Sequence, residues 1–81
     1  MVVHRVEFTI EPFVEARPGL HVTAPIEELR TMGIDVTVGP FGSECTIEPS
    51  RSSTVVAVIV RAAFENGASH VNLDVTGDRE S

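Results

Sequence analysis

The sequence contains no lysine, and its six arginines stand against twelve aspartates and glutamates, which gives a formal net charge of −6 at pH 7. Binding to a nucleic-acid backbone requires clustered basic residues. This composition therefore argues against nucleic acid as a partner. It is compatible with a cationic small molecule, a metal ion or a basic protein as a partner. The alternative is that the acidic excess serves only to keep the protein soluble.

Cysteine and long apolar runs are scarce as well. Cys45 is the single cysteine, so no disulfide framework stabilises the fold. No apolar run approaches the ~20 residues of a membrane span, and residues 1–5 are too short and polar for a secretory signal. We expect a cytoplasmic protein with no membrane partner. A single domain over residues 1–81 has a small core, so self-association is an expected source of stability.

The clearest strand signal lies near the start of the chain. Residues Val3–Glu11 alternate, with Val6, Phe8 and Ile10 on one face and polar side chains on the other, which predicts a half-buried strand. The loop that follows contains one large apolar side chain, Phe13. We expect Phe13 to cover one end of the core, with stacking against a ligand as the alternative.

Residues 34–48 contain two further alternating runs, separated by Gly39-Pro40-Phe41-Gly42. This pattern predicts a β-hairpin with a loop of about four residues. Val38 on the first strand is expected to face the core. Cys45 and Ile47 on the returning strand are expected to do the same.

Two segments show helical spacing of apolar residues. The first runs from about Val22 to Met32. Its proline, Pro25, is tolerated best in a first turn, which places the cap near Thr23. Gly33 is expected to end this helix in a left-handed conformation. The second helix is expected at about Ser53–Asn66.

A final strand is expected at His70–Val75, and residues 76–81 read as a frayed polar tail. The order is then β-α-β-β-α-β. With short, right-handed connections this order predicts an α+β, ferredoxin-like sandwich, in which two helices cover one face of a four-stranded antiparallel sheet. The spatial order of strands would be fourth, first, third, second.

This topology leaves one sheet face uncovered and rich in carboxylates. It also brings the first strand's exit, the first helix's start, the hairpin loop, the second helix's exit and the last strand's start to one end, where a small-molecule site is expected. The candidate ligand-binding residues at that end are Glu11, Phe13, His21, Phe41, Glu44, Asn66 and His70.

Catalytic and metal chemistry is poorly supported. The side chains of His21, His70, Glu11 and Glu44 are possible ligands, but their scattered positions have no metal-binding spacing, so no metal is expected. Cys45 is expected to face the core, where thiols are usually inert. The carboxylates show no nucleophile beside a base. We therefore expect a protein that is not an enzyme and uses no cofactor.

Three segments resemble the small thiamine-binding, YkoF-like proteins, namely residues 6–12, 38–43 and 62–68. Their order and spacing match that family over nearly the whole chain, and the Gly-Pro-Phe-Gly hairpin motif is the most specific of them. The resemblance implies a non-enzymatic protein that binds thiamine or its hydroxymethylpyrimidine moiety. It also implies a homo-oligomer, either a homodimer or a homotetramer.

Thiamine carries a permanent positive charge on an aromatic ring, which suits an acidic pocket with phenylalanines nearby. In this hypothesis Glu11 and Glu44 are the charge partners and Phe13 and Phe41 stack. His21 or Asn66 would bond the pyrimidine. The alternative is an oligomeric structural or regulatory domain that uses its acidic sheet face for protein–protein contacts.

Overall fold

The computed structural model describes residues 2–13 and 19–79. Four strands, two α-helices and one short 3₁₀ helix make up this part of the chain. In chain order they are β1 (Val2–Glu11), α1 (Leu20–Thr31), β2 (Thr37–Gly39), β3 (Gly42–Ile47), the 3₁₀ helix η1 (Pro49–Arg51), α2 (Ser52–Glu65) and β4 (His70–Arg79).

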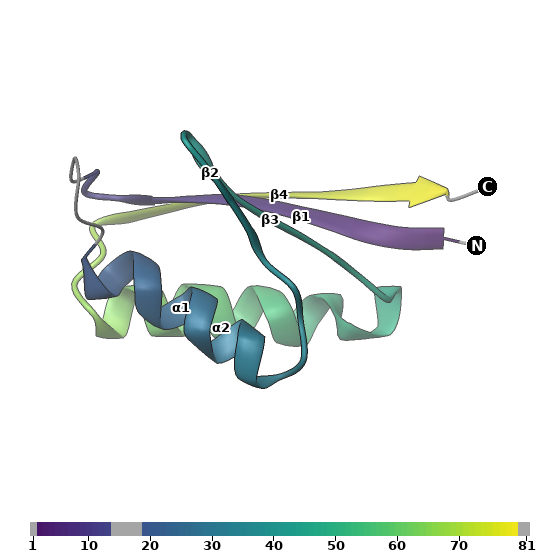
Figure 1. Cartoon of the computed structure of the whole chain (residues 1–81), viewed down its shortest axis with the longest axis horizontal. Helices are drawn as coiled ribbons and strands as arrows, with labels where there is room; N and C mark the ends of the chain where they lie inside the picture. Colours follow the sequence, from purple (N-terminus) through teal and green to yellow (C-terminus); the bar gives the residue numbers. More distant parts are fainter. Residues whose placement is uncertain (1, 14–18, 80–81) are drawn as a thin grey trace.

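The four strands form one antiparallel sheet in the order β2-β3-β1-β4, and both helices cover the same face of it (Figure 1). This is the α+β, ferredoxin-like fold that the sequence predicts, with the predicted strand order. Within residues 2–13 and 19–79, neither α-helix has the length and apolar character needed to cross a membrane.

The core forms because β1 alternates and lies in the middle of the sheet. Val6, Phe8 and Ile10 are buried against the helices, and Val6 has no exposed surface. Leu29 of α1 and Ile59 of α2 are also completely buried. Burying a side chain of this size stabilises the fold by about 1.5–3 kcal/mol relative to exposure, so this one strand anchors much of the core.

The end of α1 agrees with the prediction. Gly33 has a φ of 80°, in the left-handed region that glycine adopts without a steric penalty. Its N–H donates to Arg30 O at 3.0 Å, and the Ile34 N–H donates to Leu29 O at 3.1 Å. Together these two bonds form a Schellman cap, which satisfies carbonyls that the helix leaves free.

The predicted start of α1 is wrong. The helix begins at Leu20, with Gly19 as its N-cap, so Pro25 lies inside the helix rather than in its first turn. Thr23 is not the cap; its hydroxyl contacts Gly19 O at 3.4 Å from within the helix. Pro25 has no N–H to give to the carbonyl of His21. Its ring is nevertheless fully buried, and this packing offsets the missing bond.

The connection between β2 and β3 is shorter than predicted. Gly39 pairs with Gly42, so only Pro40 and Phe41 connect the strands, where the sequence suggested about four residues. Strand β2 is also short. Val38, which was expected to face the core, is instead 57% exposed.

Strand β4 is longer than predicted. Residues 76–79 were expected to be part of a frayed tail, but β4 continues to Arg79 and pairs with β1 as far as Val2. Arg5 also forms an ion pair with Asp78 at 3.3 Å. The polar composition of this segment hid its strand character, because its stabilisation comes from pairing with the other end of the chain.

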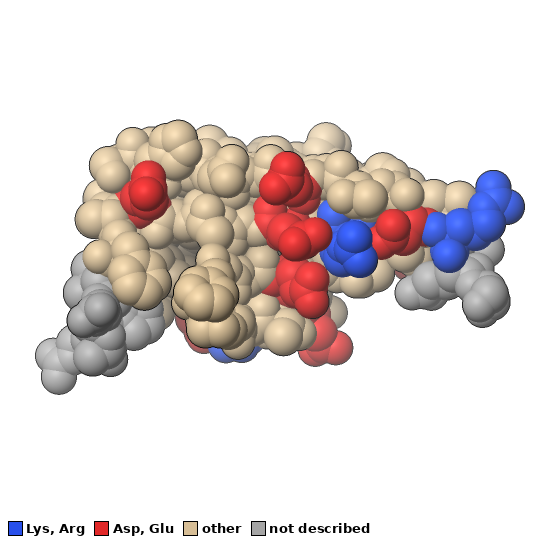
Figure 2. Space-filling model, turned by 90° about the horizontal axis from the view of Figure 1, so that it is seen from above, with Lys and Arg blue, Asp and Glu red and all other residues tan. Residues whose placement is uncertain are grey.

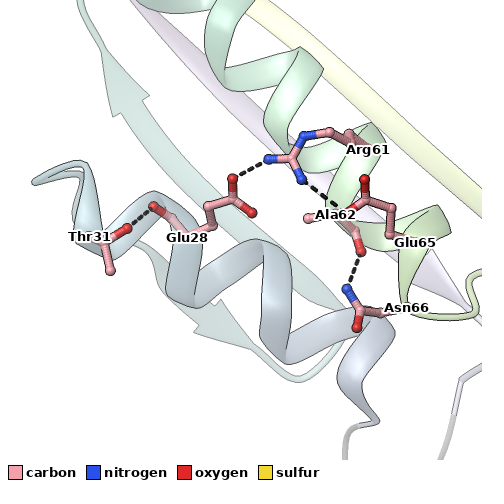
Figure 3. A network of polar contacts seen from close by, with 6 residues as sticks. All are labelled: Glu28, Thr31, Arg61, Ala62, Glu65 and Asn66. Carbon is pink, nitrogen blue, oxygen red and sulfur yellow. Dashed lines mark hydrogen bonds and ion pairs between the residues drawn. The ribbon is translucent and has the colours of Figure 1, made fainter.

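Polar contacts tie α1 to α2 on the surface that faces away from the sheet (Figure 3). Arg61 of α2 contacts Glu28 of α1, and its other terminal nitrogen donates to Glu65 Oε2 at 3.1 Å. The hydrogen bond to Glu28, and then the charge of Glu28, raise the pKa of Arg61. At the end of α2, Asn66 donates from its side chain to Ala62 O at 2.7 Å.

We predict that amide hydrogen exchange will show the full length of β4. The amides of residues 76–79 that point toward β1 should exchange as slowly as those of residues 71–75, because they belong to the same ladder. Amides that point to the free edge should exchange fast and serve as the internal control. Uniformly fast exchange beyond Val75 would contradict the extended strand.

Candidate functional site

The tip of the β2–β3 hairpin rises above the sheet on the side away from the helices (Figure 1). Between the tip and β1 lies a hollow of about 330 Å³, which we name the outer hollow. Besides the hairpin tip, its lining includes Glu7, Thr9, Asn72 and Asp74. It therefore combines two carboxylates, a hydroxyl and an amide with the exposed ring of Phe41.

The outer hollow exists because glycines occupy the hairpin tip. A Cβ placed on Gly42 would lie 2.9 Å from Thr9 Cγ2, closer than real Cβ contacts come, and 3.0 Å from Phe8 O, tighter than most of them. A Cβ on Gly39 would lie 3.3 Å from Gly42 O. Glycine thus lets the tip lie directly beside β1, and the side-chain-free surface becomes the floor of the hollow.

Carboxylates cross the middle of the open sheet face in one line. Glu7 on β1 lies opposite both Glu44 on β3 and Asp74 on β4, and we name these three residues the acidic row. Figure 2 shows this face, with acidic atoms across its middle and basic atoms toward one end. Like charges directly opposite one another destabilise a sheet, so a cation at this place would relieve the repulsion.

Arg5 is the cation nearest to the acidic row. Its Nε lies 3.2 Å from Glu7 Oε1, in an ion pair whose geometry is not that of a hydrogen bond, and its Nη1 lies 3.3 Å from Asp78. Neither Glu44 nor Asp74 has an ion-pair partner among the described residues.

A second hollow, of about 220 Å³, lies where β1, the hairpin tip and the start of α1 meet, and we name it the inner pocket. Its walls include the apolar side chains of Phe13, Val22, Val38 and Phe41, and Ser43 supplies a hydroxyl. Among its lining residues there is no carboxylate and no basic group. The two hollows share the hairpin tip but differ in chemistry.

The two phenylalanines of the predicted site are both placed at these hollows. Phe41 is 89% exposed and lines both of them. Phe13 lines the inner pocket and is 74% exposed. The expectation that Phe13 covers the core is therefore wrong, because Ile10 already fills that end of β1 and the loop carries Phe13 outward.

The other predicted site residues lie outside both hollows. Glu11 and His70 face each other across β1 and β4, and Glu44 belongs to the acidic row. His21 is buried, and its Nε2 donates to Pro12 O at 2.6 Å. Asn66 is used in the helix-end bond described above. His21 and Asn66 therefore serve the fold in this structure.

Sequence reasoning missed Glu7, Asn72 and Asp74 as site residues. A usable signal was present, because the predicted topology places the first and last strands side by side. The pairs Glu7–Asp74 and Thr9–Asn72 follow once the register is known. The sequence placed Glu11 and His70 at the same end of the sheet, but alternation alone does not fix which residues of the two strands pair.

Catalytic chemistry has little support in the described residues. No group of three or more His, Cys, Asp or Glu side chains there is arranged to hold a metal ion. His4 Nδ1 contacts the Ser52 hydroxyl, which ties β1 to the start of α2, but His4 has no carboxylate contact that would orient it as a base. Burial, and secondarily Glu44, raises the pKa of the Cys45 thiol, which disfavours the nucleophilic thiolate.

Solved structures share this fold. The chain superposes on a domain of unknown function, DUF77, from Bacillus cereus with a TM-score of 0.67 and 19% identity, over 96% of this chain and 76% of that one. A "putative thiamine biosynthesis/salvage protein" from Thermotoga maritima gives 0.67 and 22%, over 96% and 84%. A protein from Streptococcus pneumoniae gives 0.61 and 17%, over 98% and 88%. No family model and no curated protein matches the sequence.

We predict that Cys45 makes the protein less stable in alkali. Since burial raises the thiol pKa in the folded state, the unfolded chain loses a proton that the folded chain keeps once the pH passes the ordinary thiol value of about 8.5. The free energy of unfolding should therefore fall as the pH rises above that value. Denaturant titrations of the parent protein and Cys45→Ala at pH 7.5 and 9.5 measure this, and equal losses in both proteins would contradict it.

Proposed function

We propose that the protein is a non-enzymatic binding protein for a small cationic molecule, thiamine or its hydroxymethylpyrimidine moiety, and that the outer hollow is the binding site. The observation that carries the proposal is the joint presence of Glu7, Asp74 and the exposed ring of Phe41 around one hollow. Carboxylates attract a cationic ring, and a phenylalanine face adds cation–π attraction of about 0.5–1 kcal/mol at an exposed site.

The remaining groups of the outer hollow suit the uncharged half of such a ligand. The Asn72 amide both donates and accepts hydrogen bonds, and so does the Thr9 hydroxyl. An aminopyrimidine carries both hydrogen-bond donors and acceptors, so it needs partners of both kinds. The likeness in fold to the Thermotoga maritima protein supports a thiamine-related role. The absence of a base-oriented nucleophile among the described residues favours binding over catalysis.

We predict that the double variant Glu7→Gln/Asp74→Asn binds thiamine more weakly, by roughly fivefold, since two exposed charge contacts contribute about 1 kcal/mol together. Isothermal titration calorimetry is the suitable measurement, because the sequence lacks the tryptophan and tyrosine that fluorescence would need. Hydroxymethylpyrimidine, which lacks the thiazolium, should lose less affinity than thiamine.

The matched control is Glu11→Gln/Glu48→Gln, which removes the same charge at exposed positions outside both the hollow and the acidic row. Its thiamine affinity should change less than that of Glu7→Gln/Asp74→Asn. Equal weakening in both variants would mean that only the net charge matters. Absence of saturable heat with either compound on the folded parent protein would reject the proposed ligand.

We also propose that the protein self-associates, and that two copies meet at the free edge of β4. Strand β4 is the last in the sheet order, so one side of its backbone is unpaired within the described chain. Val75 of this strand is 46% exposed, and Phe64 of α2, the helix that contacts β4, is 50% exposed. Strand addition to an unpaired edge with adjacent apolar surface is a common mode of association. The acidic row makes stacking of two open faces less favourable, because like charges would meet.

We predict that Val75→Lys shifts the protein toward the monomer in sedimentation equilibrium. The new charge would lie within the proposed contact and resist burial. Val38→Lys is the control, because Val38 has a similar exposure but lies at the opposite edge of the sheet. A parent protein that is already monomeric at high concentration, or equal effects of both variants, would refute this interface.

A further inference from the structure

We propose that the inner pocket is a second binding site, distinct from the outer hollow, for a small aromatic or branched aliphatic molecule that ends in a carbonyl or carboxylate oxygen. The inference does not depend on the proposed thiamine function. It follows from the exposure of the pocket rim, the state of Ser43 and the position of the start of α1.

The rim of the inner pocket is unusually apolar for a surface. Phe13, Val38 and Phe41 are 74%, 57% and 89% exposed, and all three surround this pocket. Apolar side chains gathered around a concave surface, and not scattered singly, are typical of a binding site. Deeper in the pocket, Phe8 and Ile10 supply a buried apolar wall.

The pocket is also lined by a hydroxyl, that of Ser43, which has no partner among the described residues. Ser43 lies on the helix-facing side of β3 with Cys45 and Ile47, and only 8% of its surface is exposed. Its hydroxyl forms no hydrogen bond with any described residue. The hydroxyl can therefore donate to a molecule in the pocket. A ligand oxygen in the pocket would satisfy it.

The start of α1 favours an oxygen at the same place. Gly19, the N-cap of α1, lines the inner pocket. The first internal bond of the helix is the one from the Val22 N–H to Gly19 O. The positive end of the helix dipole therefore lies at the pocket. Together with the Ser43 hydroxyl, this end favours a carbonyl or carboxylate oxygen over a cation.

The size of the pocket agrees with one ring and a short polar group. An apolar cavity of about 150 Å³ is large enough to hold benzene, and the inner pocket measures about 220 Å³. The chemistry differs from that of the outer hollow, whose carboxylates would repel a carboxylate ligand. The two sites should therefore select different molecules.

Heteronuclear NMR titration with toluene, phenylacetamide and phenylacetate tests the proposal. Saturable shifts are expected at Val22 and Val38, which line only the inner pocket, and smaller ones at Asn72, which lines only the outer hollow. Phenylacetamide and phenylacetate should bind more tightly than toluene. In Ser43→Ala this advantage should fall roughly fivefold, as expected for one lost hydrogen bond, while toluene binding stays unchanged.

Two further variants make the test decisive. Ser53→Ala removes an exposed hydroxyl from α2 and should leave all three affinities unchanged. Val38→Asp changes an exposed rim residue, so the fold is retained, and should weaken phenylacetate more than phenylacetamide. Absence of saturation with all three probes overturns the site. Equal affinity for toluene and the oxygen-bearing probes, or no effect of Ser43→Ala, overturns the assigned role of Ser43.

Discussion

The pairing of β1 with both of its neighbours is the constraint on which the rest of the structure depends. Because β1 lies between β3 and β4, its alternation decides which residues reach each side of the sheet. Phe8 and Ile10 belong to the core and to the wall of the inner pocket, Glu7 lines the outer hollow, and Thr9 between them lines both. A register slip of one residue would exchange these roles and destroy the core and both sites at once.

The hairpin tip converts this regular sheet into two chemically different hollows. Strand β3 pairs with β1 only as far as Ser43, and the two-residue connection Pro40-Phe41 then turns the chain back. Glycine at positions 39 and 42 brings the tip close to β1 without filling the space beside it. The hairpin tip therefore separates the outer hollow, which carboxylates line, from the inner pocket, which is lined mainly by apolar side chains.

The sequence was sufficient for the fold but only partly for the site. Alternation at Val6, Phe8 and Ile10 and the left-handed Gly33 are local signals, and both were predicted correctly. The extension of β4 was missed because its polar residues are held by pairing with residues far away in the sequence. The start of α1 was misplaced because the buried ring of Pro25 compensates for its missing donor. The composition of the outer hollow could not be derived, since it requires the exact β1–β4 register.

The pairing of Val2 with Arg79 also has a consequence for how the chain can be rearranged. The two ends of the described chain are neighbours on adjacent strands, at the end of the sheet away from the Glu11–His70 pair. A short engineered turn would therefore join them as a hairpin and permit circular permutation, with new termini opened in a surface loop such as the one that precedes β2. Fusion tags or a tandem second copy attached at either end would extend away from both hollows and leave them accessible.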